Sequence, residues 1–183
     1  MNAFELILTD EEKRFCKELV DWVIRDHLGL TSDPKPVMDS RTLREELGAF
    51  VTLKSGGRLR GCIGNIVGNG PLVATIERMA GAAAFEDPRF APLAADEIEG
   101  LHIEVSVMGP LSPCPDAELI EPGRHGLYIR KAMHSGLLLP QVATEWGWDR
   151  ETFLDQTCVK AGLPKGTWRK PKTEIWWFEA VIF

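Results

Sequence analysis

The segment RLRGCI, residues 58–63, places a cysteine two residues after an arginine in a stretch typical of a β-strand. Alternate strand residues project to one face, so the sequence predicts that Arg58, Arg60 and Cys62 share a face. Cysteine acts as a nucleophile, a redox group or a metal ligand in its thiolate form, which nearby positive charge favours. Gly61 and Gly64 leave room beside the sulfur for a ligand or another backbone segment. A packed free cysteine in a glycine-rich bend fits the same residues, and both hypotheses stay open.

The glycines of residues 61–70 do not fit the common phosphate-binding loops. A Walker loop requires lysine directly after its last glycine, but Gly70 is followed by Pro71. The dinucleotide pattern GxGxxG also fails, because the glycines fall at positions 61, 64, 68 and 70. A weaker anion site remains open, in which backbone N–H groups ahead of a helix starting at Pro71 contact a negative charge.

Other polar residues stand where a strand could present them to a reaction. Glu104 shares one face of the strand LHIEVSVMGP with His102 and Ser106, and His125 opens a later strand. Glu104 and His125 are candidate acid–base partners for Cys62 if the fold brings them close. Asp87 and Arg89, in the segment DPRF, are expected to pair and to fix the turn that follows a helix.

The elements that must position these residues follow from periodicity and end signals. The chain should contain, in order, a helix capped by Thr9 and Glu12, a hairpin over residues 49–66, a helix from Pro71, a strand over residues 101–110, a second hairpin around residues 134–136, a helix capped by Asp149 and a final strand over residues 174–183. Hairpins mixed with helices predict an α+β protein with a largely antiparallel sheet.

Composition narrows the class of protein. The chain has 183 residues, 44% hydrophobic residues and a net charge of −6, which is typical of a globular protein and disfavours broad binding to nucleic acid. No apolar run approaches the roughly 18–20 residues that span a bilayer, and no secretory signal is recognisable, so we expect a cytoplasmic protein. The four cysteines form no CxxC pair, which argues against a disulfide framework and a zinc site. A basic cluster at residues 165–172 is expected to be a solvated loop.

Several segments of the chain stand out in combination: LRGCIG, AFEDPRFAPL, LHIEVSVMGP, the HGL of RHGLYI, GLLLPQVA, WDRETFL and CVKAGLP. Together they resemble the AMMECR domain family, that of AmmeMemoRadiSam system protein A. The resemblance runs in order from about residue 10 to residue 183, which implies a single AMMECR domain over residues 1–183. It also implies an α+β fold with a barrel-like antiparallel sheet flanked by helices, in two unequal lobes with a cleft. It names no cofactor.

The resemblance places the functional region near LRGCIG, which points to Arg60, Gly61, Cys62, Ile63 and Gly64. Bacterial and archaeal members are often encoded beside, or fused to, Memo-type and radical-SAM proteins, which implies such partners. We therefore expect a component that binds a small anionic ligand or a partner protein at these residues, with Arg58 beside them.

The alternative is an enzyme that uses Cys62 as a thiolate nucleophile or redox thiol on a small anionic substrate. In that hypothesis Arg60 lowers the pKa of the thiol or holds the substrate, and Glu104 and His125 move protons. A third hypothesis gives the motif a purely structural role, as a tight turn under the adjacent helix.

Overall fold

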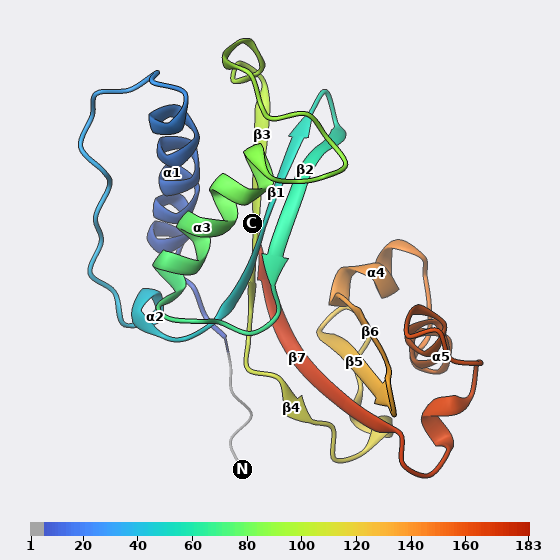
Figure 1. Ribbon diagram of the computed structural model, residues 1–183. Coiled ribbons are helices and arrows are strands. Elements are labelled where there is room, and N and C mark those ends of the chain that lie inside the picture. The colour runs from blue at the N-terminus through green and yellow to red at the C-terminus, as the bar shows by residue number, and fades with distance from the viewer. Residues whose placement is uncertain (1–5) are drawn as a thin grey trace. The chain divides into compact units, whose positions relative to one another are not determined.

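The computed structural model describes residues 6–183, which divide into two compact units (Figure 1). The larger one, here the N-terminal unit, comprises residues 7–108 together with the last three residues, 181–183. The C-terminal unit comprises Leu6 and residues 109–180. Each unit has its own antiparallel strands and helices, so the predicted α+β class and largely antiparallel pairing are confirmed.

The N-terminal unit consists of three strands and two long helices. Its elements are α1 (Asp10–His27), α2 (Arg41–Arg44), β1 (Gly48–Ser55), β2 (Arg58–Asn65), α3 (Leu72–Phe85), a 3₁₀ turn at Ala95–Glu97 and β3 (Leu101–Met108). β1 is central, since it pairs antiparallel with β2 on one side and with β3 on the other. β2 is therefore an edge strand.

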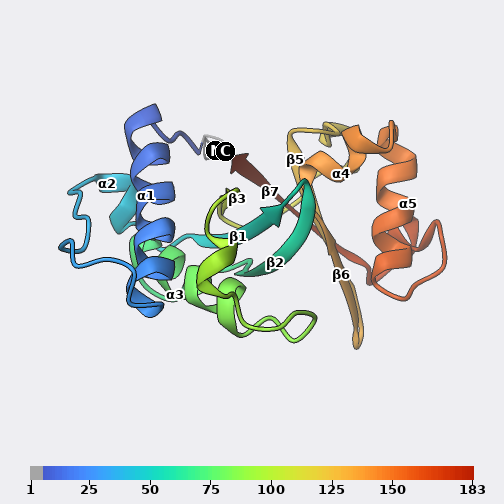
Figure 2. The ribbon, with the colours of Figure 1, turned by 90° about the horizontal axis from the view of Figure 1, so that it is seen from above.

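The two long helices cover one face of this sheet (Figure 2). α3 packs on β1 and β2, while α1 packs on α3 and β3. Val51, Leu53, Val105 and Val107 are fully buried on the covered face, as the alternation in both strands predicts. The small side chains of α3 allow its main chain to come close to the sheet: a Cβ atom at Gly61 would lie 2.1 Å from the carbonyl oxygen of Ala83.

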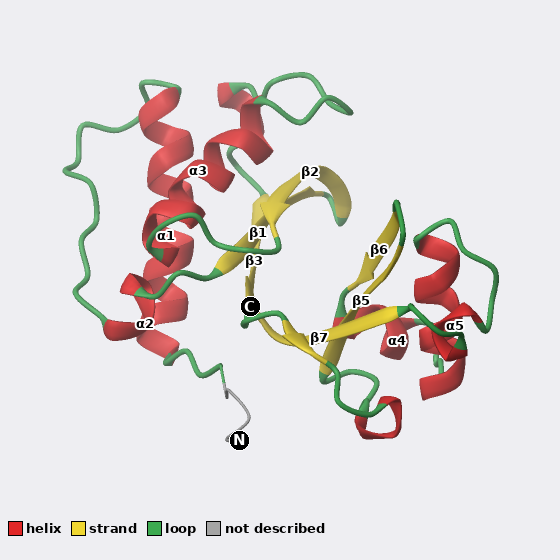
Figure 3. Ribbon diagram, turned by 60° about the horizontal axis from the view of Figure 1, so that its bottom comes forward, coloured by secondary structure: helices red, strands yellow, loops and turns green. Residues whose placement is uncertain are grey.

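The C-terminal unit repeats the combination of a hairpin and a helix (Figure 3). Its elements are β4 (Ser112–Pro113), a 3₁₀ turn at Ala117–Leu119, β5 (His125–Lys131), β6 (His134–Leu138), α4 (Pro140–Glu145), α5 (Arg150–Lys160), a 3₁₀ turn at Thr167–Arg169 and β7 (Glu174–Ile182). β5 pairs with both β6 and β7, and β4 pairs with β7. Leu127, Ile129, Phe153 and Leu154 are fully buried in its core.

The helix ends follow the sequence signals closely. Thr9 and Glu12 form the expected capping box, and the Asp149 side chain accepts a hydrogen bond from the Thr152 N–H at the start of α5. The second hairpin differs from the prediction, because its turn lies at residues 132–133 and His134 already begins β6. Within residues 6–183, no helix has the length and apolar character needed to cross a membrane.

Candidate functional site

A bulge in β2 places Arg58 and Cys62 on opposite faces of the sheet. Thr52 pairs with Cys62 and Leu53 with Gly61, but Lys54 pairs with Leu59, which leaves Arg60 without a partner in β1. The extra residue breaks the two-residue alternation, so Leu59 takes the side of Lys54. The prediction that Arg58, Arg60 and Cys62 share one face is therefore wrong. A strand bulge leaves no clear signal in the residue pattern that surrounds it.

Arg60 is instead held by a carboxylate in the 3₁₀ turn that precedes β3. Its Nε and Nη2 atoms donate to the two carboxylate oxygens of Glu97 at 2.7 and 2.8 Å, and its guanidinium lies 5.9 Å from the centre of the Phe90 ring. The hydrogen bond to Glu97 raises the pKa of Arg60, and the same pair lowers the pKa of Glu97 to about 2. The charge of Arg60 is thus taken up by Glu97 rather than directed at the thiol.

Asp87 and Arg89 pair as expected, and together they clamp the free edge of β2 at Cys62. The Asp87 carboxylate accepts the Cys62 N–H at 2.8 Å, and Arg89 Nη2 donates to the Cys62 carbonyl at 3.1 Å. Two further bonds from Arg89 to Asp87, at 2.9 and 2.7 Å, join the two side chains. Hydrogen bonds from Arg89 hold the pKa of the buried Asp87 well below its usual range. Both the N–H and the C=O group of Cys62 are therefore held at the outer edge of β2.

The Cys62 side chain lies on the face of the sheet that α1 and α3 do not cover. We call this the thiol face and define it by Phe50, Thr52, Lys54, Cys62 and Glu104. Cys62 Sγ lies 3.2 Å from Thr52 Oγ1, and Lys54 Nζ donates to Glu104 at 2.9 Å. All five side chains are half-buried, so the face is accessible in part.

Cys62, Thr52 and Glu104 form a row across the three strands. Thr52 pairs with Cys62 on one side and with Glu104 on the other. Two strand spacings separate Cys62 from Glu104, about 10 Å between their Cα atoms. Thr52 is thus the direct neighbour of the thiol, although the sequence did not single it out. The hairpin pattern gives no signal for this pair, because an unbroken register counted from the turn at Gly56 and Gly57 would align Val51 with Cys62, and the bulge shifts the pairing by one residue.

The glycines and Ile63 of LRGCIG have packing roles. Gly61 faces α3, where any side chain would meet the main chain of Ala83. At Gly64 a Cβ atom would lie 2.2 Å from the ring of Phe50, which covers that position. Ile63 pairs with the fully buried Val51 and is half-buried itself. These three residues bring the sheet close to the helix and shape the floor of the thiol face.

His125 belongs to the C-terminal unit, so its expected partnership with Cys62 stays a prediction. Its Nδ1 accepts the Glu121 N–H at 3.0 Å, and its ring packs on Trp177 in a tilted arrangement with 4.5 Å between centroids. Burial lowers the pKa of His125 below its ordinary value, which favours the neutral ring. These contacts give the histidine a local structural role.

The other three thiols differ from Cys62. Cys16 and Cys158 are fully buried, and burial raises the pKa of Cys16 to about 12. Cys114 is half-buried, and its Sγ donates to the Asp116 carbonyl at 3.3 Å. Across residues 6–183, no three His, Cys, Asp or Glu side chains are grouped in a way that could hold a metal ion.

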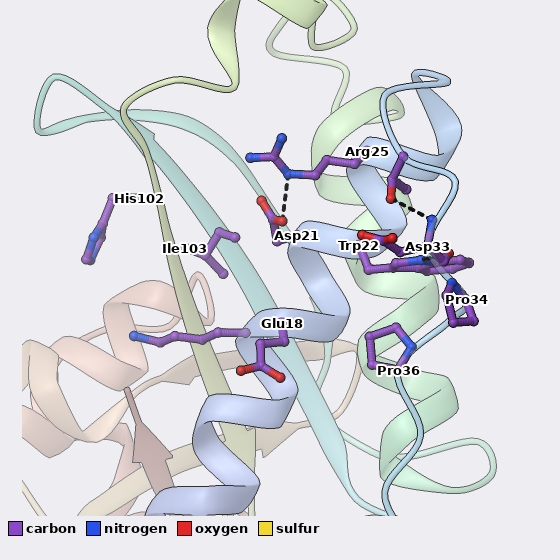
Figure 4. A pocket seen from close by; sticks show the side chains of 11 residues that line it. Glu18, Asp21, Trp22, Arg25, Asp33, Pro34, Pro36, His102 and Ile103 are labelled. Atoms are coloured by element: carbon purple, nitrogen blue, oxygen red, sulfur yellow. Dashed lines mark hydrogen bonds and ion pairs between the residues drawn. The ribbon is translucent and has the colours of Figure 1, made fainter.

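A separate open cavity of about 590 Å³ lies along α1, and Cys62 does not line it (Figure 4). Its lining includes Trp22, whose indole N–H donates to the Asp33 carbonyl at 2.9 Å, and the ion pair between Arg25 and Asp21. Charges of both signs surround it, so the cavity does not select one class of ligand.

The protein is of the α+β class, with antiparallel strands in each unit, and its strand β2 is bound at Cys62 by Asp87 and Arg89. These features agree with the resemblance that the LRGCIG segment indicated. The AMMECR1 family model matches residues 17–183, and the chain belongs to this family. A protein of Methanothermobacter thermautotrophicus is 40% identical, over 96% of this chain and 95% of its own length. A Thermococcus gammatolerans protein is 43% identical over 96% of this chain and 91% of its own.

The fold agrees with that of a solved relative. The crystal structure of the uncharacterized protein PH0010 from Pyrococcus horikoshii matches with a TM-score of 0.81 and 39% identity. The match covers 96% of this chain and 92% of that one. The overall AMMECR-like fold expected from the sequence is thereby confirmed.

Proposed function

We propose that this chain is a binding component that recognises a partner protein through the thiol face, and that its partners are Memo-type and radical-SAM proteins. The observation that supports this most directly is the clamp at Cys62. Asp87 and Arg89 hold the main chain of β2, while the side chain of Cys62 stays half-exposed beside Thr52. A rigid strand with accessible side chains is a preorganised recognition surface.

The contacts around Cys62 favour binding over catalysis. An activated nucleophile needs a base within about 2.6–3.2 Å. The neighbour of the thiol is the hydroxyl of Thr52, and Glu104 lies two strands away in an ion pair with Lys54. Arg60, the expected activating cation, is bound to Glu97.

The charges of the thiol face favour a protein partner over a small anion. Lys54 is the lysine of this face, and Glu104 already neutralises it. A small anion would have to displace that carboxylate. A protein surface can instead carry charges opposite to those of Lys54 and Glu104, and it can contact Phe50, Thr52 and Cys62 at the same time.

Biolayer interferometry with immobilised Memo-type or radical-SAM protein tests the proposal. Glu104→Lys places two lysines together on the thiol face, and we expect it to weaken binding by about tenfold or more because a partner surface that matches a lysine and a glutamate does not match two lysines. Glu99→Lys is the matched control, since Glu99 is an exposed glutamate of the same unit outside the thiol face. Cys62→Ser should bind as the wild type does.

Equal losses in the Glu104→Lys and Glu99→Lys variants would show that binding does not use the thiol face. Binding of neither protein by the wild type would rule out these two partners. Loss of binding in folded Cys62→Ser would show that the thiol itself is required, which the proposal does not allow.

The alternative function, an enzyme with Cys62 as nucleophile, is tested by iodoacetamide labelling against pH, followed by peptide mapping. For the proposed binding role, Cys62 should label no faster than a free cysteine at each pH. Cys16 and Cys158 provide internal controls, because both are fully buried and should label only after unfolding. Rapid labelling of Cys62 well below neutral pH would favour the enzyme instead.

A further inference from the structure

We propose that the outer edge of β6 binds an extended segment of another protein, which adds to the C-terminal unit as a further strand. β6 lies at the end of its sheet, since β5 pairs with it on one side and with β7 on the other. The surface is distinct from the thiol face and independent of the function proposed for it.

The hairpin geometry identifies the main-chain groups that face outward. Lys131 pairs with His134 across the two-residue turn at Ala132 and Met133, where Ala132 has φ 53°. The closing pair of such a turn is a hydrogen-bonded pair, and bonded and non-bonded pairs alternate from there. Gly136 therefore bonds inward to β5, while Ser135 and Leu137 direct N–H and C=O away from it.

These outward groups have no other main-chain partner in the described part of the chain. Outside the strand ladders and helices, no backbone hydrogen bond of residues 6–183 involves Ser135 or Leu137. Ser135 is exposed and Leu137 is half-buried. A row of unpaired donors and acceptors on a strand edge is a template for another strand.

The edge strands β2 and β6 are protected very differently. β2 carries Arg58 and Arg60, contains a bulge, and has its outward groups at Cys62 occupied by Asp87 and Arg89. Charges, bulges and covering side chains are the devices that keep an edge from pairing. β6, with the sequence HSGLL, has no Lys, Arg, Asp, Glu or Pro and pairs with β5 in unbroken register.

The surroundings of β6 indicate the chemistry of the segment. Leu137 pairs with Tyr128 on the face away from α5, so an added strand should present apolar side chains there. On the other face the end of α5 lies directly on β6, since a Cβ atom at Gly136 would be 2.4 Å from the Ala161 nitrogen. We therefore infer an extended segment with apolar residues at alternate positions.

A second copy of this chain fits less well. Antiparallel pairing of β6 with itself would place both α5 helices on the same face of the joined sheet. Their ends would bring two copies of the exposed Lys160 together, and like charges repel. Ser135 would also face Leu137 of the other copy, which pairs a polar with an apolar side chain.

Amide hydrogen exchange by NMR tests the proposal on the full chain. The probe is the capped peptide HGLYIRK, the sequence of β5, which already matches the inner edge of β6. In the free protein, Leu137 N–H should exchange quickly and Gly136 N–H slowly. At about 1 mM peptide, exchange at Leu137 should slow by about tenfold or more because its N–H becomes hydrogen-bonded.

Matched variants separate edge pairing from other binding. Ser135→Pro removes an outward N–H without removing a bond to β5, so peptide protection should be lost, whereas Ser135→Thr should retain it. A control peptide with proline at the position of Ile129 should give no protection, and it needs no change in the protein. Slow exchange at Leu137 in the free chain, no protection by HGLYIRK, protection that survives Ser135→Pro, or dimerisation through β6 would each overturn the proposal.

Discussion

At the scale of single residues, Gly61 shows why LRGCIG needs its glycines. Helix α3 comes so close to this residue that a Cβ atom added to Gly61 would lie 2.1 Å from the carbonyl oxygen of Ala83. A backbone atom in the last turn of a closely packed helix cannot move aside easily. The glycine next to Cys62 thus serves the contact between helix and sheet, on the face opposite to the thiol.

Gly61→Ala should destabilise the protein by about 2–3 kcal/mol, because overpacking forces β2 and α3 apart. Gly81→Ala is the matched control within α3, where no atom lies within 4 Å of the added Cβ. It should stabilise by up to about 1 kcal/mol through helix propensity. Urea unfolding measures both changes in free energy. An unchanged free energy of unfolding in Gly61→Ala would mean that α3 can shift without loss of stability.

Ionisation of Glu97 makes the free energy of unfolding depend on pH in the acid range. Its hydrogen bond from Arg60 lowers its pKa in the folded state to about 2, from an ordinary value of 4.5. The folded state therefore binds fewer protons, and the stability from this pair is present above pH 4.5 and lost as the pH falls toward 2. Glu97→Gln should unfold more easily than the wild type at pH 7, with a difference that shrinks through this window.

Thermal unfolding between pH 2 and pH 7 measures that difference. Glu99→Gln, in the same loop and exposed, should follow the wild-type curve throughout. A constant gap between Glu97→Gln and the wild type across the window would show that ionisation of Glu97 does not carry the effect.

At the scale of elements, side-chain contacts join the loop after α3 to the edge of β2. The loop contributes Asp87 and Arg89 to the backbone of Cys62, Phe90 to the surroundings of Arg60, and Glu97 to its guanidinium. The segments DPRF and LRGCIG are thus joined by side chains that replace a neighbouring strand. This arrangement blocks pairing at that edge and keeps the thiol face fixed.

Asp87→Ala should destabilise by about 1–3 kcal/mol, since it leaves the Cys62 N–H without its acceptor. Hydrogen exchange at Cys62 should become faster in this variant. Asp87→Asn should retain part of the protection, because its amide oxygen can still accept. Asp96→Ala removes an exposed carboxylate from the same loop and should change neither quantity. Unchanged exchange at Cys62 in Asp87→Ala would contradict the clamp.

At the scale of the whole molecule, the chain leaves the N-terminal unit after Met108 and returns to it at its last three residues. There Phe183 exchanges two backbone hydrogen bonds with Val105 of β3, at 2.9 and 3.1 Å. The last three residues of the chain therefore belong to the unit that carries the thiol face, although most of β7 pairs with β5 and β4.

Deleting residues 181–183 should destabilise the N-terminal unit by about 1–3 kcal/mol through the two lost hydrogen bonds. Hydrogen exchange of β3, at Val105 above all, should accelerate, while the core amides of α5 keep their protection. Val37→Ser, at a valine that is 92% exposed in the N-terminal unit, serves as the control. Equal loss of protection in both units would show that they unfold together.

The sequence by itself determined the elements and the class of fold. The capping residues Thr9 and Asp149, the alternation in β3 and the two hairpins are local patterns, and local patterns depend on residues a few positions apart. The pairing of Asp87 with Arg89 was also predictable, because the two residues are neighbours. The family followed from motifs in their order along the chain.

Only the tertiary structure decided what surrounds Cys62. It set the bulge in β2, and it brought together residues between 10 and 37 positions apart: Arg60 with Glu97, and Cys62 with Asp87 and Thr52. Such contacts depend on strand register and on how closely α3 approaches the sheet, and neither is encoded in a short stretch of sequence. The sequence identified the residues of the motif, but the faces on which their side chains lie and the partners that they contact depend on the packed fold.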